Sequence, residues 1–97
     1  MIEDMPISEA AWYGRTAIMR SLLEAQANID AVTTGGPGPG MSALMIAVMR
    51  GQVGAVRVLL HAGANKEIKD EKGRNAFDYA REGGRRGEAE HIMELLS

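Results

Sequence analysis

Few side chains in this 97-residue sequence have the types and spacing that chemistry requires. The two histidines, His61 and His91, lie far apart in the chain, and neither has a partner at metal-ligand spacing. Ser8, Ser21 and Ser42 have no general base placed beside them by a recognisable motif. The sequence therefore predicts a protein that is not an enzyme, with no catalytic residue, no metal site and no cofactor.

Residues 31–40, AVTTGGPGPG, form the glycine-rich segment that invites comparison with a phosphate-binding loop. Such loops bind phosphate through consecutive backbone N–H groups and a following Lys. Pro37 and Pro39 each remove a backbone donor, and no Gly-Lys-Ser/Thr sequence follows. We expect instead an extended inserted loop whose residues 34–39 are mobile and dispensable for the fold. Packing of Trp12 on the loop prolines is an open alternative.

Composition and charge argue against several classes of partner. The formal net charge of −2 gives no general attraction to nucleic acid or to an anionic membrane surface. The absence of cysteine excludes a disulfide framework. No basic-then-apolar leader opens the sequence, and no apolar run is long enough to span a membrane. We expect a cytoplasmic or nuclear protein with no signal or transmembrane segment.

The segment from Gly40 to Asn65 predicts two short helices packed back to back. The Ser42 hydroxyl can accept a hydrogen bond from a free backbone N–H in the first turn, and Gly51 ends this first helix. Apolar residues then recur at helical spacing and predict a second helix that ends at Gly63. These residues are Val53, Val56, Leu59 and Leu60.

The same pattern occurs once before this segment and once after it. In the earlier copy Gly14 corresponds to Gly51, and Gln26 occupies the position of Gly63, which predicts a weaker helix end. In the later copy Gly73 corresponds to Gly40, and we align Leu95-Leu96 with Leu59-Leu60 by placing the start of the last helix after Gly87. The chain is therefore predicted to contain three helical hairpins.

The central unit resembles an ankyrin repeat. The positions of the Gly-x-Thr-Pro-Leu-His-x-Ala motif and its continuation are occupied by Gly40, Ser42, Ala43, Leu44, Met45, Ala47, Gly51, Val58-Leu59-Leu60 and Gly63-Ala64-Asn65. The departures are Ser for Thr, Ala for Pro and Met for His. The resemblance implies an all-α, ankyrin-like solenoid of three helix-turn-helix repeats joined by extended finger loops. It covers residues 1–97 as a single domain, with repeats at about 2–30, 39–71 and 72–97.

In the ankyrin family the finger tips and first helices line a concave surface that binds other proteins. The resemblance therefore implies a non-catalytic protein–protein interaction module that binds a protein partner on the concave groove. The net charge predicts that neither nucleic acid nor membrane is a partner. Alignment of the three copies places several side chains typical of binding hot spots at positions that the resemblance implies are exposed. The predicted partner-binding residues are Trp12, Tyr13, Met41, Met49, Arg50, Arg74 and Glu82.

Some of these residues have an alternative place in the core. Met41, Met45 and Met49 recur at helical spacing, as flexible thioethers that suit either a contact surface or a packed interior. Met45 and Tyr79 are expected in the core, whereas Asp70 is expected to be a solvated charge in a turn. The alternative function is a structural or capping segment of a longer array, with weak self-association into a homo-oligomer.

Overall fold

The computed structural model describes residues 7–33, 40–82 and 86–97. Over these ranges the chain forms six α-helices and an isolated antiparallel bridge between Val32 and Ser42. The helices are α1 (Ile7–Tyr13), α2 (Thr16–Glu24), α3 (Ala43–Met49), α4 (Val53–His61), α5 (Ala76–Glu82) and α6 (Arg86–Leu96). The predicted all-α architecture of helix-turn-helix repeats is confirmed. The expectations for loop residues 34–39 lie outside the described residues.

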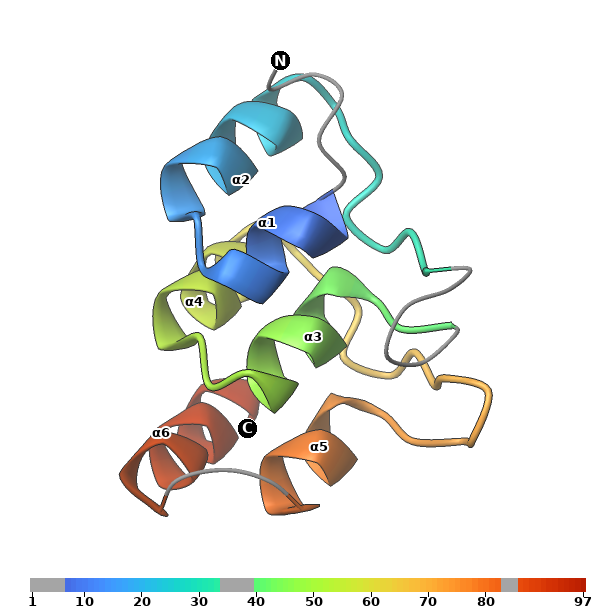
Figure 1. The fold of residues 1–97 in the computed structure, drawn as a ribbon, viewed down its shortest axis with the longest axis vertical. Coiled ribbons are helices and arrows are strands. Elements are labelled where there is room, and N and C mark those ends of the chain that lie inside the picture. Colours follow the sequence, from blue (N-terminus) through green and yellow to red (C-terminus); the bar gives the residue numbers. More distant parts are fainter. Residues whose placement is uncertain (1–6, 34–39, 83–85) are drawn as a thin grey trace.

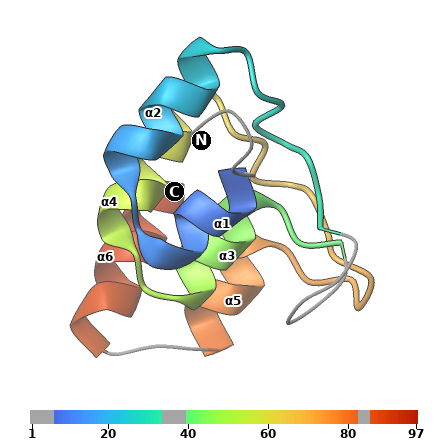
Figure 2. The same cartoon turned by 45° about the horizontal axis from the view of Figure 1, so that its top comes forward.

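The helices form an inner and an outer layer (Figure 1). In the inner layer α3 packs between α1 and α5, and in the outer layer α4 packs between α2 and α6. The two helices of each hairpin also pack against each other. The described parts of the loops that lead into α3 and α5 project from the inner layer, away from the outer helices, as both views show (Figures 1 and 2). Each repeat therefore contacts mainly its neighbours in sequence, as expected of a solenoid.

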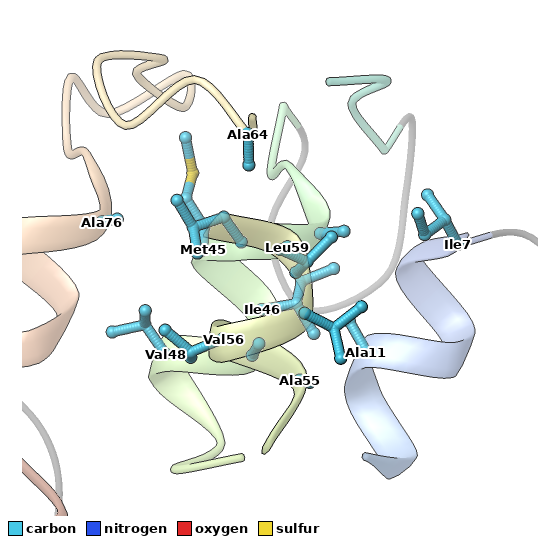
Figure 3. Packing of buried hydrophobic residues seen from close by; sticks show 14 of the residues in the cluster. Ile7, Ala11, Met45, Ile46, Val48, Ala55, Val56, Leu59, Ala64 and Ala76 are labelled. Carbon is cyan, nitrogen blue, oxygen red and sulfur yellow. The ribbon is translucent and has the colours of Figure 1, made fainter. Parts of the chain in front are cut away.

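α3 lies at the centre of the core. All of its residues from Ala43 to Val48 are buried, because α1, α4 and α5 cover it on three sides. Met45 is only 1% exposed, which confirms its predicted place in the core. Side chains from α3 and α4 fill the space between α1 and α5 (Figure 3). A helix that is apolar all round is stable only when buried in this way.

The predicted ends of α3 are also confirmed. The Ser42 hydroxyl accepts a hydrogen bond from the Met45 backbone N–H at 3.3 Å, which satisfies one free donor of the first turn. At the other end Gly51 has a φ of +71°, a left-handed conformation that glycine adopts without strain. The finger loop and the α3–α4 turn are thereby fixed at opposite ends of this helix.

Met41 lies in the core and not on the surface, so the prediction that it contacts a partner is wrong. Its side chain is 1% exposed. Met41 precedes α3, and its backbone pairs with Thr33 across the finger loop, with Thr33 N donating to Met41 O at 2.9 Å. The Met41 N–H in turn donates to Thr33 Oγ1 at 3.2 Å. Met41 lies in the loop before α3. The helical spacing of Met41, Met45 and Met49 in the sequence therefore does not predict the direction of the Met41 side chain.

The last helix differs from its predicted register. α6 begins at Arg86, before the predicted start after Gly87. Leu96 is fully buried like Leu59. Leu95, however, is half-buried, as is Leu60. By burial, Leu96 corresponds to Leu59. The predicted alignment of Leu95-Leu96 on Leu59-Leu60 is therefore wrong by one residue.

Gln26 ends α2 in the left-handed conformation that Gly63 adopts at the end of α4. Its φ is 67°, against 91° for Gly63. The hydrogen bonds that close the two helix ends match: Ala27 N donates to Leu22 O at 2.9 Å, and Ala64 N donates to Leu59 O at 3.0 Å. The weakness predicted at Gln26 is therefore a matter of backbone strain, because a side chain disfavours positive φ.

Replacing Gln26 with glycine should raise the free energy of unfolding by roughly 0.5–1 kcal/mol. Relief of the left-handed strain, about 1–2 kcal/mol, exceeds the entropy that glycine gains in the unfolded chain. Urea denaturation measures the difference. The reciprocal variant Gly63→Gln should lose a similar amount, and a destabilised Gln26→Gly protein would contradict this account of the helix end.

Candidate protein-interaction surface

Trp12 and Arg50 lie together at the C-terminal ends of α1 and α3. The guanidinium carbon of Arg50 is 4.3 Å from the centroid of the Trp12 ring, within the range of a cation–π contact. Arg50 Nε also donates a hydrogen bond to the Trp12 carbonyl oxygen at 3.3 Å. Trp12 is half-buried and Arg50 is exposed. The two side chains are neighbours, as the alignment of the first two repeats predicts.

Gln52 also contacts Trp12, although the sequence did not predict it as a site residue. Its Nε2 donates to the Trp12 carbonyl oxygen at 3.1 Å. Gly14 lies against it, because a Cβ added at Gly14 would come within 2.8 Å of Gln52 Cδ. The available signal was positional: Gln52 follows Gly51 as Arg15 follows Gly14, so both occupy the turn between the helices of a repeat.

Tyr13 and Met49 extend the surface around Trp12 and Arg50. Tyr13 is 58% exposed, and the Arg15 guanidinium carbon lies 5.7 Å from its ring centroid. Met49 is half-buried and packs partly against the core. We call these residues, Trp12, Tyr13, Met49 and Arg50, the Trp12–Arg50 patch. The patch lies at the turn ends of the inner helices, whereas the finger loops lead into the opposite ends.

Arg74 and Glu82 form a separate polar pair on the third repeat. Arg74 Nη1 donates to Glu82 Oε1 at 2.8 Å. The Arg74 guanidinium carbon also lies 4.9 Å from the centroid of the Tyr79 ring. α5 packs on α3 from the side opposite to α1 (Figure 1). The seven predicted residues are thus divided among the Trp12–Arg50 patch, the Arg74–Glu82 pair and the buried Met41.

Asp70 is buried beside Tyr79, which corrects the expectation of a solvated charge. Asp70 is 9% exposed and Tyr79 is 8% exposed, the latter in the core as predicted. The carboxylate accepts hydrogen bonds from the Tyr79 hydroxyl and from the backbone N–H groups of Lys72 and Arg74, both at 2.9 Å. This cluster fixes the finger loop that leads into α5 to that helix.

These contacts shift the pKa values of both groups. Burial acts to raise the pKa of Asp70, but the hydrogen bonds from Tyr79 and the two backbone amides outweigh it and lower that pKa. Burial raises the pKa of Tyr79 from 10.0 to about 12, and the hydrogen bond to Asp70 adds to this effect. The folded state therefore holds the Tyr79 proton more tightly than the unfolded chain does.

This difference predicts a loss of stability at alkaline pH. The contribution of Tyr79 is fully present below its unfolded pKa of 10.0 and is lost as the pH rises toward about 12. Between about pH 9 and about pH 11, the free energy of unfolding should fall by roughly 1 kcal/mol more in the natural protein than in Tyr79→Phe. Urea titrations of both proteins at the two pH values measure this. Equal pH dependence in the two proteins would contradict the proposed role of burial at Tyr79.

The described residues contain neither a metal-binding cluster nor a membrane-spanning helix. In the ranges 7–33, 40–82 and 86–97, no group of three or more His, Asp or Glu side chains is placed to hold a metal ion. Within the same ranges, no helix has both the length and the apolar character needed to cross a bilayer.

Stacked helical hairpins joined by projecting loops define the class of helical-repeat solenoids, whose surfaces form extended binding sites. Within this class the chain belongs to the ankyrin repeat family, because the model of that family, ankyrin repeats, matches residues 7–97 in three copies. Ankyrin repeats generally mediate protein–protein interaction, and the family is generally non-enzymatic.

A curated relative matches part of the chain. Over 40 residues, 41% of this chain, the sequence is 55% identical to protein HOS4 of Saccharomyces cerevisiae. The matched part covers 4% of the length of that relative. The likeness therefore concerns a short stretch of repeat sequence and not the relative as a whole.

Proposed function

We propose that this protein is an interaction module that binds a protein partner on the concave side of its inner layer, through the Trp12–Arg50 patch. The observation that carries the proposal is the stack of Arg50 on Trp12, with the guanidinium 4.3 Å from the ring centroid. Trp, Tyr and Arg are the residue types enriched at binding hot spots. An exposed guanidinium on an aromatic ring offers a partner both charge pairing and stacking.

Pre-organisation supports the proposal. The side chains of Arg50 and Gln52 are held in place, because both donate hydrogen bonds to the Trp12 backbone carbonyl oxygen. A side chain that is already ordered loses less entropy when a partner binds. We propose Arg74 and Glu82 as polar contacts at the far side of α3, where they already neutralise each other at 2.8 Å. Their contribution to affinity is small, because a partner must replace an ion pair that is already satisfied.

Capture of binding proteins tests the proposal directly. The immobilised natural protein should retain a partner that the Trp12→Ala/Tyr13→Ala double variant does not retain. Circular dichroism of the double variant must show the same helical content, so that the loss reports the surface and not the fold. Retention of the same partner by both proteins would overturn the role of the patch.

A second candidate function rests on the comparison with protein HOS4, in which the similar stretch is 4% of a longer chain. On this reading the three repeats are a structural segment that stacks on further repeats or on a second copy of itself. Sedimentation at increasing concentration separates the two candidates. A concentration-dependent dimer, together with no captured partner, favours the structural role.

A further inference from the structure

The outer layer carries a groove that the proposed partner site does not use. It runs between α2 and α4, and its lining includes Arg20, Leu23, Glu24, Gly54, Arg57 and Val58. The Trp12–Arg50 patch lies on the inner layer instead, at the ends of α1 and α3. The groove is therefore a separate surface.

The charges in this groove are predominantly positive. Arg20 and Arg57 are both exposed, and in the described part of the chain neither forms an ion pair with a carboxylate. The Arg57 Nη2 donates to His91 Nε2 of α6 at 2.9 Å, which orients the guanidinium but leaves its charge uncompensated. His61 also lines the groove, and the carboxylate in its lining is that of Glu24. Two arginines that form no ion pair among the described residues, in a groove lined by one carboxylate, favour an anionic ligand.

The floor of the groove is apolar and open because of Gly54. This glycine lies in α4 without the positive φ that would require it, so an alanine here would favour the helix by roughly 0.5–1 kcal/mol. A Cβ at Gly54 would approach Thr16 Cγ2 to 3.3 Å and would occupy the groove. Leu23 and Val58 also line it, so a ligand can bury an apolar side chain between the two helices.

We infer that this outer groove binds an acidic segment of a protein, with carboxylates paired to Arg20 and Arg57 and an apolar side chain seated against Leu23 and Val58. Charge complementarity selects this ligand. The apolar floor distinguishes it from a simple polyanion, since a polyanion gains nothing from Leu23 and Val58.

A synthetic peptide tests the inference on the full chain. The probe is a fluorescein-labelled dodecapeptide with a central leucine flanked by glutamates, and its binding is followed by fluorescence anisotropy. Arg20→Ala and Arg57→Ala should each weaken binding about fivefold, the scale of one exposed charge pair. The matched control is Arg81→Ala on α5, because Arg81 is already paired with Asp78. This control should bind like the natural protein.

Two further measurements separate groove binding from other outcomes. Gly54→Met should fill the groove and weaken binding at least about fivefold with unchanged helicity, and amide shifts in the natural protein should concentrate on α2 and α4. A glutamine version of the peptide should bind weakly, and so should a version with glycine in place of leucine. Equal binding of either version, or of the two arginine variants, would overturn the inference. Amide shifts confined to α1 and α3 would also overturn it and would assign the peptide to the Trp12–Arg50 patch.

Discussion

Replacement of Leu59 by alanine should leave the protein largely unfolded at about 37 °C. Leu59 has no exposed surface and lies in the core that α4 shares with α3 (Figure 3). Loss of a fully buried leucine side chain costs roughly 2–5 kcal/mol, from lost burial and from the cavity left behind. A three-repeat array has little stability to spare, because three repeats are about the minimum for a stable stack, and its free energy of unfolding therefore lies near the lower end of the roughly 5–15 kcal/mol of native proteins. Thermal unfolding followed by circular dichroism measures the effect.

Leu60 supplies a matched control for this experiment. It is the same residue type, one position further along α4, and it is only half-buried. Leu60→Ala should therefore cost clearly less than Leu59→Ala, since less apolar area and less cavity volume are involved. A melting temperature of Leu59→Ala within a few degrees of the natural protein, or a greater loss for Leu60→Ala, would show that the buried face of α4 is assigned wrongly.

The second large effect concerns binding. Truncation of Trp12 or Arg50 to alanine should weaken the binding of the captured partner by roughly 2 kcal/mol, about 30-fold in affinity, if these residues are hot spots. Because Arg50 stacks on Trp12, the double variant should lose less than the sum of the single losses. Isothermal titration with the captured partner measures the three variants.

Arg50→Ala is the cleaner of the two single variants. Arg50 is exposed, so its truncation should leave stability nearly unchanged, whereas half-buried Trp12 also packs against the core. Arg81→Ala is the control, an exposed arginine already paired with Asp78 and outside both the patch and the outer groove, and this variant should bind the captured partner normally. If Trp12→Ala unfolds the protein while Arg50→Ala binds the partner like the natural protein, Trp12 is a core residue and the Trp12–Arg50 patch is not the binding site.

The fold could be predicted well from the sequence because its determinants are local. The Ser42 cap and the turn at Gly51 depend on residues within a few positions, and both are confirmed. Gln26 shows the limit of this reasoning. The sequence indicated a weaker helix end there. Only the backbone φ of 67° shows that Gln26 adopts the left-handed conformation typical of glycine, and that it does so with backbone strain.

The site was harder to predict because it depends on contacts between repeats. The alignment of the copies places Trp12 on Met49 and Tyr13 on Arg50, and it therefore correctly brought Trp12 near Arg50, because corresponding helix ends of neighbouring repeats lie side by side. It failed for Met41, whose backbone pairing with Thr33 turns the side chain into the core. The expectation of a solvated Asp70 rested on the usual exposure of charged turn residues. It failed because the sequence does not show that Tyr79 donates a hydrogen bond to the Asp70 carboxylate.

The position of α3 between α1 and α5 also has a consequence for the dynamics of the native state. Its buried backbone is covered by both neighbouring repeats, whereas the first and third repeats are each covered on one side. In a linear stack, partial opening starts where a unit has one neighbour and leaves the remainder intact. In the 97-residue chain studied by itself, amide hydrogens of α3 should therefore exchange with solvent only on global unfolding, while those of α2 and α6 should exchange through local opening of the first and third repeats.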